Sequence, residues 1–238
     1  MKTRSLLLIL AVAATASVQA TPVTISQWTF ELSAPTTAGP ISPETGSGEA
    51  TAVGTAGYSN PVGNGSAESW SAISWSVGDY WQFRVSASGY ENIELSWDQT
   101  GSGSGPRDFD LKYSTDGTTF SVFASYTVRN NASPAWVSTT SSSLYSYTCD
   151  LSSIAALNNA VAVYFRLVDA STTSANGGTV GSSGTDRVDN FTVSGTVIPS
   201  GVPDPPPGLA SWACLLGLLA LTRWFPRIRS TADARSVW

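Results

Sequence analysis

The side chains that could do chemistry in this chain are few and scattered. None of the 238 residues is histidine, the commonest general base and the commonest zinc ligand in proteins. A Ser-His-Asp hydrolase is therefore excluded. Two facing carboxylates could hydrolyse a glycosidic bond, but the 17 acidic residues show no spacing that favours such a pair. We predict that the protein is not an enzyme.

One carboxylate breaks the pattern of its surroundings. Asp189 shares the parity of Phe191 and Val193 in an alternating segment, which places it beside the core. A buried carboxylate needs a partner. Arg187 lies two residues away on the same face, and an N-terminal strand that carries Glu31 is expected nearby.

Glu31 and Asp189 suggest a structural metal. The pair resembles the acids from the first and last strands with which jelly-roll carbohydrate-binding modules hold a structural calcium, an ion that prefers hard oxygen ligands. That resemblance implies calcium at Glu31 and Asp189. The alternative is a strand-end aspartate, shifted by a β-bulge, that accepts backbone N–H bonds or pairs with Arg187.

Three tryptophans fall in or beside polar stretches. Exposed aromatic rings are platforms for sugar rings, so Trp70, Trp75 and Trp136 are candidate carbohydrate-binding residues. The alternative is that these large side chains close the ends of the fold or cover the edges of its core.

Charge and cysteine content exclude other classes. Only 12% of the residues are charged, the net charge is −5, and the central region has no cluster of Lys and Arg, so we expect no nucleic-acid partner. Cys214 lies in an apolar C-terminal run, which leaves Cys149 without a partner for a disulfide. Cys149 is expected to be a half-buried residue on a strand.

Period-two alternation dominates the middle of the chain and predicts strands that are half buried. Some eight or nine strands joined by Gly/Ser-rich connections favour an all-β antiparallel sandwich of jelly-roll type, with an immunoglobulin-like sandwich as the alternative. Segments 33–69, 101–105 and 171–184 are expected to be surface loops, and segment 150–159 a short helical turn. The alternating segments are 28–32, 81–85, 93–97, 109–113, 120–128, 161–167 and 188–197.

The N-terminus has the pattern of a secretory signal peptide over residues 1–20. Lys2 and Arg4 precede an apolar stretch, and small residues end at Ala20. We predict cleavage after Ala20 and a β-sandwich domain over residues 21–198.

The C-terminus has a short motif, an apolar segment and a basic stop. Residues 199–207 are Pro-rich and form a linker, residues 208–229 form a predicted membrane helix with its basic end, and residues 230–238 form a cytoplasmic tail by the positive-inside rule. The motif is Val202, Pro203, Asp204 and Pro205, and the basic stop is Arg223, Arg227 and Arg229.

This arrangement resembles the PEP-CTERM sorting signal in its VPD-type variants, although Asp204 replaces the family's Glu. The resemblance implies a bacterial exported protein that is held transiently in the membrane, processed by exosortase and associated with exopolysaccharide. The central segment also resembles sandwich domains found on such proteins. We therefore expect a non-catalytic cell-surface or matrix protein. The alternatives are a carbohydrate-binding module with structural calcium and, third, a glycan-active enzyme.

Overall fold

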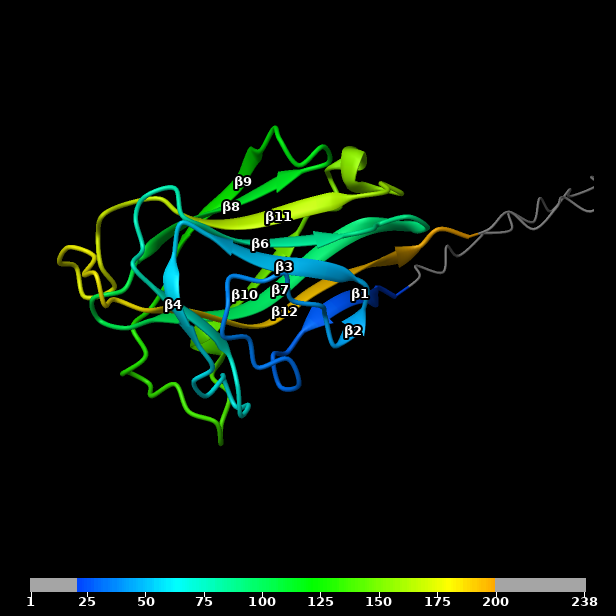
Figure 1. Ribbon diagram of the computed structural model, residues 1–238. Helices are drawn as coiled ribbons and strands as arrows, with labels where there is room; N and C mark the ends of the chain where they lie inside the picture. Colours follow the sequence, from blue (N-terminus) through cyan, green and yellow to red (C-terminus); the bar gives the residue numbers. More distant parts are fainter. Residues whose placement is uncertain (1–20, 200–238) are drawn as a thin grey trace, which may run out of the picture. The chain divides into compact units, whose positions relative to one another are not determined.

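The computed structural model describes residues 21–199. The predicted signal peptide, sorting motif, C-terminal helix and basic stop all lie outside these residues. Figure 1 shows two antiparallel sheets packed face to face, which confirms the predicted all-β sandwich. In the part of the chain that the structure describes, no helix has the length and hydrophobicity needed to cross a bilayer.

The larger sheet has seven strands. Its main path runs β10-β7-β12-β1-β2, and β5 pairs with β12 while β4 pairs with β5. The bounds are β1 Val23–Trp28, β2 Thr45–Gly46, β4 Ala56–Ser59, β5 Trp70–Ile73, β7 Tyr90–Gly101, β10 Ser146–Asp150 and β12 Asp186–Val197.

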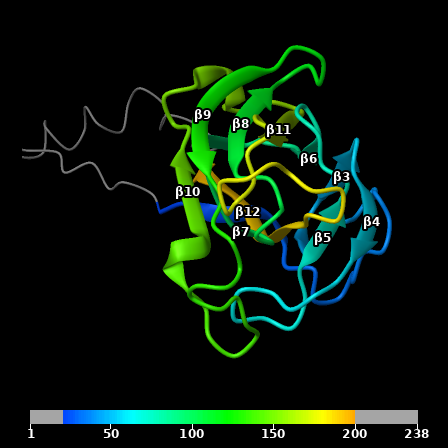
Figure 2. The same cartoon turned by 90° about the vertical axis from the view of Figure 1, so that its left-hand side faces the viewer.

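The smaller sheet has five strands in the order β3-β6-β11-β8-β9. Seen along the strands in Figure 2, it arches over β10, β7 and β12, so the two sheets enclose the core between them. The bounds are β3 Gly48–Val53, β6 Tyr80–Val85, β8 Asp108–Ser114, β9 Ser121–Thr127 and β11 Val163–Asp169. Two 3-10 turns complete the fold, η1 Ser143–Tyr145 and η2 Ala155–Leu157.

Aromatic side chains from both sheets fill the core. Phe83 from the smaller sheet stacks on Phe191 from the larger one with 3.5 Å between ring centroids, and Trp28 packs edge to face against Phe83 at 5.2 Å. Burial of such rings is the dominant stabilising term of a small sandwich. Other fully buried members of this layer are Trp70, Trp81, Phe109 and Phe165.

The structure differs from the predicted strand map in several places. Segment 33–69 contains β2, β3 and β4, because Ala50 and Ala52 face the core with side chains too small to give a clear alternation signal. Leu32 lies in a loop and is 86% exposed, since Phe30 leaves the extended conformation with φ 60°. Val161 is 83% exposed because β11 begins at Val163.

The first and last strands are neighbours. β1 and β12 pair antiparallel, with Val23 opposite Gly195. Both ends of the domain therefore lie at the same end of the sandwich, at the right in Figure 1.

Candidate binding face of the five-stranded sheet

Every second residue of the central strands of the smaller sheet points away from the core. On β6 these residues are Tyr80, Gln82 and Arg84, and on β11 they are Tyr164 and Arg166, while their neighbours along each strand are buried. We call this surface the five-stranded face. Its members are Glu49, Thr51, Tyr80, Gln82, Arg84, Asp110, Lys112, Phe120, Tyr164 and Arg166.

Arg166 is the centre of this face. The strand register places it between Gln82 of β6 and Lys112 of β8. Its Nε donates to Gln82 Oε1 at 2.8 Å, and its guanidinium carbon lies 4.0 Å from the ring centroid of Tyr80 and 3.6 Å from that of Phe120. Cation–π contact with two rings and a hydrogen bond to an amide hold the guanidinium in one orientation.

Tyr164 is held from the side by the β8–β9 turn. Gly117 has φ +73°, and a Cβ at this position would lie 3.0 Å from Tyr164 Cζ, so the turn rests on the ring only because residue 117 is glycine. Asp116 fixes the turn by accepting hydrogen bonds from the amides of Thr118 and Thr119 at 2.8 and 2.7 Å. These bonds lower the pKa of Asp116 well below its usual value.

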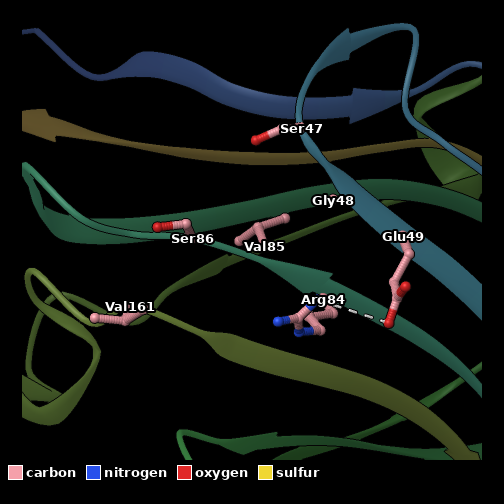
Figure 3. A pocket seen from close by; sticks show the side chains of 7 residues that line it. All are labelled: Ser47, Gly48, Glu49, Arg84, Val85, Ser86 and Val161. Carbon is pink, nitrogen blue, oxygen red and sulfur yellow. Dashed lines mark ion pairs between the residues drawn. The ribbon is translucent and has the colours of Figure 1, made fainter.

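A shallow pocket adjoins the face where β6 ends and β11 begins. Figure 3 shows Arg84 and Glu49 on its wall, with their ion pair drawn between β6 and β3. The Nη1–Oε1 distance is 3.9 Å. The pocket encloses about 270 Å³, just below the roughly 300 Å³ at which small-molecule sites begin. Its remaining lining residues are Ser47, Gly48, Val85, Ser86 and Val161.

The outer side of the seven-stranded sheet is different in kind. One row across β1, β12, β7 and β10 consists of Gln27, Thr192, Ser96 and Thr148, all with short or uncharged side chains. This row offers hydroxyl groups but no ring and no cation, so it lacks the mixture of groups seen on the five-stranded face.

The carboxylate that the sequence singled out pins a loop to the larger sheet. A register shift follows Asp189 in β12, and Asn190 has φ 52°. This bulge breaks the alternation. Asp189 and Phe191 therefore point to opposite sides of the sheet, whereas their spacing in the sequence predicted the same side. Asp189 accepts hydrogen bonds from Ser66 Oγ at 2.7 Å, from the Asn64 amide at 3.0 Å and from the Asn190 amide at 2.8 Å.

The same loop is tied to a second one. The side-chain amide of Asn64 donates to Ser142 O at 3.1 Å and its Oδ1 accepts the Ser142 amide at 2.8 Å, while the amide of Gly65 donates to Val137 O at 2.9 Å. Loop 61–69 is thus fixed to β12 on one side and to loop 131–145 on the other.

Glu31 and Asp189 do not assemble a calcium cage in this structure. Glu31 Oε1 accepts the amide of Glu68 at 2.9 Å, and the oxygens of Asp189 face three protein donors. Among residues 21–199 no three acidic, cysteine or histidine side chains come together in a way that would hold a metal ion. Glu31, in the turn after β1, and Asp189, on β12, each hold loop 61–69, and an N–H that points at a carboxylate oxygen competes with a cation for it.

Three carboxyl groups with raised pKa values lie inside the fold. Burial raises the pKa of Asp169 to about 6 and that of Asp189 to about 7, and it raises the pKa of Asp186 well above its usual value. All three side chains are at most 1% exposed. Shifted pKa values are typical of active sites when the titratable groups line a cleft. These three carboxyl groups are instead enclosed by protein.

The three candidate tryptophans are buried rather than exposed. Trp70 is fully buried, and Trp75 and Trp136 are each 5% exposed. Trp70 and Trp75 belong to the main core, and Trp136 packs edge to face on Tyr145 and donates its Nε1–H to Val62 O. Their rings offer no face to a sugar in this conformation. They are off-pattern because they fill the core from strand ends and loops.

The residues that sequence reasoning missed share one signal. Tyr80, Gln82 and Arg84 alternate with buried residues on one strand, and Tyr164 and Arg166 do the same on its neighbour. Planar polar side chains at the outward positions of two strands indicate a binding site on the face of a sheet rather than one built from loops. The pairing of these two strands was not visible in the sequence.

No protein-family model matches this chain. No curated protein matches it either. Among solved structures, the chain is similar to the CBM22-2 xylan-binding domain of Xyn10C from Paenibacillus barcinonensis, with 15% identity over 72% of this chain and 99% of that chain and a TM-score of 0.41.

Two further structures of this kind are similar to the chain. The K2 cleaved adhesin domain of Lys-gingipain shows 15% identity over 72% of this chain and 97% of that chain, with a TM-score of 0.39. TmCBM61, determined in complex with β-1,4-galactotriose, shows 8% identity over 61% of this chain and 86% of that chain, with a TM-score of 0.34. These similarities assign no functional role to any residue of this chain.

Proposed function

We propose that residues 21–199 form a non-catalytic carbohydrate-binding domain, and that the five-stranded face holds the glycan. The observation that carries the proposal is the fixed arrangement of half-exposed rings and planar polar groups around Arg166. A sugar ring has an apolar C–H surface, which packs on aromatic carbon, and a rim of hydroxyls, which need hydrogen-bond partners.

The face supplies both kinds of partner. Tyr80, Phe120 and Tyr164 provide aromatic carbon, and each is half-buried so that its neighbours hold it in place. Gln82 provides an amide, which both donates to and accepts from hydroxyls, and Arg84 provides a guanidinium, which donates to them. Because these side chains stand on neighbouring β-strands or, for Phe120, directly before β9, binding a glycan orders few groups that are not already ordered.

The enclosed carboxyl groups support a binding role rather than a hydrolytic one. A glycosidase needs two carboxyl groups on either side of the scissile bond. Three carboxyl groups have raised pKa values and so tend to stay protonated: Asp169, Asp186 and Asp189. All three are inside the protein, where a polysaccharide does not reach them.

Export to the bacterial cell surface is part of the same proposal. The signal-peptide pattern of residues 1–20 and the motif at Val202 to Pro205 support it, together with the basic stop that begins at Arg223. The jelly-roll classification, exosortase processing and a place among exopolysaccharide belong to this proposal as well.

The test is affinity electrophoresis of the full chain, purified in a mild detergent, in native gels that contain soluble polysaccharides. The wild type is expected to be retarded by at least one polymer. The double substitution Tyr80→Ala and Tyr164→Ala should weaken that binding by about tenfold or more, because each lost ring removes roughly 1 kcal/mol of contact.

The matched control is on the opposite side of the sandwich. Gln27→Ala with Thr192→Ala removes two polar side chains from the seven-stranded sheet and should leave the retardation as it is in the wild type. A panel without retardation, or equal losses in the two double variants, would overturn the proposal. Thermal unfolding of each variant shows that it is folded.

A further inference from the structure

Three of the basic side chains of the domain gather on the five-stranded face. Arg84, Arg166 and Lys112 stand on the adjacent strands β6, β11 and β8. Strands in a sheet lie about 4.8 Å apart, so these cations cover a span of roughly 10 Å. The other basic residues between positions 21 and 199 are Arg107, Arg129 and Arg187.

Arg166 differs from its two neighbours because it has no carboxylate partner. Among residues 21–199, ion pairs within 4 Å join Arg84, Arg107 and Lys112 to acids, and none of them includes Arg166. Its Nε is used by Gln82, and a guanidinium carries five N–H donors in all. The flanking rings of Tyr80 and Phe120 partly dehydrate the group, and this burial lowers the pKa of Arg166 from its ordinary value.

The ion pairs of the other two cations are long. Arg84 and Glu49 are 3.9 Å apart with side chains 45% and 43% exposed, and Lys112 is 3.8 Å from Asp110. Both separations exceed hydrogen-bond length, and pairs that are partly open to solvent at such distances contribute little to stability. Arg84 and Lys112 can therefore exchange these acids for a carboxylate brought by a ligand.

We infer that the glycan bound by the five-stranded face is acidic, with carboxylates of uronic-acid residues that pair with Arg166 and then with Arg84 and Lys112. This inference rests on the proposed function. An arginine fork matches a carboxylate with two parallel N–H···O bonds. A polymer with repeated carboxylates reaches cations on three strands together, which a neutral polymer cannot exploit.

The experiment compares polygalacturonate with its carboxyl-reduced form, which keeps the backbone and removes the charge. Affinity electrophoresis and calorimetry of the full chain should give at least about tenfold tighter binding to the acidic polymer, as expected for charge-assisted bonds. This preference should decrease as sodium chloride is raised from 50 to 500 mM.

Arg166→Gln should reduce the preference for the acidic polymer several-fold, and Arg166→Lys should retain more of it because the positive charge stays. Arg129→Gln makes the same change of charge at an exposed arginine outside the face and should behave as the wild type.

The outcomes separate the two proposals. Equal affinity for both polymers, or the same preference in Arg166→Gln and Arg129→Gln, would overturn the acidic-glycan inference and leave glycan binding in place. Absence of binding to either polymer and to the wider panel would overturn both proposals together.

Discussion

The two outer sides of this sandwich use charge in opposite ways. On the seven-stranded side, Asp189 is fully buried and its oxygens are occupied by Ser66, Asn64 and Asn190. On the five-stranded side, Arg166 is half-exposed and its Nε donates to the side-chain amide of Gln82. Among the described residues, no carboxylate forms an ion pair with Arg166.

This difference separates a structural carboxyl group from a cation that is available to a ligand. A buried carboxylate with every oxygen engaged holds segments of the chain together and has nothing left for a ligand. A partly dehydrated guanidinium without a counter-ion gains most when a ligand supplies one. The contrast predicts that mutations on the first side change stability and that mutations on the second side change binding.

The largest effect should follow from Asp189→Ala. The substitution leaves the amides of Asn64 and Asn190 without their acceptor and leaves Ser66 Oγ only the longer bond to Glu68 O, and an unpaired buried donor costs about 1–3 kcal/mol. We expect the free energy of unfolding at pH 7 to fall by about 3 kcal/mol in a urea titration. Asp110→Ala, at a half-exposed carboxylate on the five-stranded face, is the matched control and should cost less than about 1 kcal/mol. Equal losses of unfolding free energy in the two variants would contradict the difference between the two sides of the sandwich.

A smaller effect should appear in the pH dependence of stability. The folded pKa of Asp189, about 7, lies above the value of about 3.9 in an unfolded chain, so the folded state binds the extra proton between these pH values. Asp189 alone should therefore lower the free energy of unfolding by about 1 kcal/mol per pH unit as pH rises from 5 to 7. Asp169, with a pKa of about 6, and Asp186, whose pKa burial raises well above its usual value, act in the same direction.

No histidine contributes to this window, because the chain contains none. Urea titrations at several pH values should show a shallower slope for Asp189→Asn than for the wild type. A wild-type stability that rises between pH 5 and pH 7 would contradict the assignment.

The smallest effect should follow from Glu49→Gln. The Arg84–Glu49 pair is long and exposed on both sides, so its loss should change the free energy of unfolding by less than about 0.5 kcal/mol. Because Arg84 is then without its acid, affinity for polygalacturonate should rise by about twofold. Calorimetry checks the affinity, and a decrease would show that Glu49 itself contacts the glycan.

Much of the architecture was visible in the sequence. Alternation around Trp81, Phe83 and Val85 and around Phe109 and Leu111 correctly predicted strands, because these residues form one face of a half-buried sheet. The half-buried Cys149 on β10 was also predicted. The predicted turn after Asp150 is the 3-10 turn η2.

The site was not visible for a reason of long-range geometry. Arg166 meets Gln82, 84 residues earlier in the chain, because β11 pairs with β6, and sequence periodicity within each strand does not specify that pairing. The tryptophans misled for a related reason. Trp136 contacts Tyr145 and Val62 through loop packing, which no local pattern reports.

The pairing of β1 with β12 has a mechanical consequence. Since Val23 is opposite Gly195 and both strands end on the same side, a force applied between the two ends of the domain opens this pair from one end. The interstrand hydrogen bonds then carry the load one after another instead of sharing it, and the first to break are those beside the terminal Val23–Gly195 pair. A domain suspended by both ends would yield by peeling, while the five-stranded sheet carries none of that load.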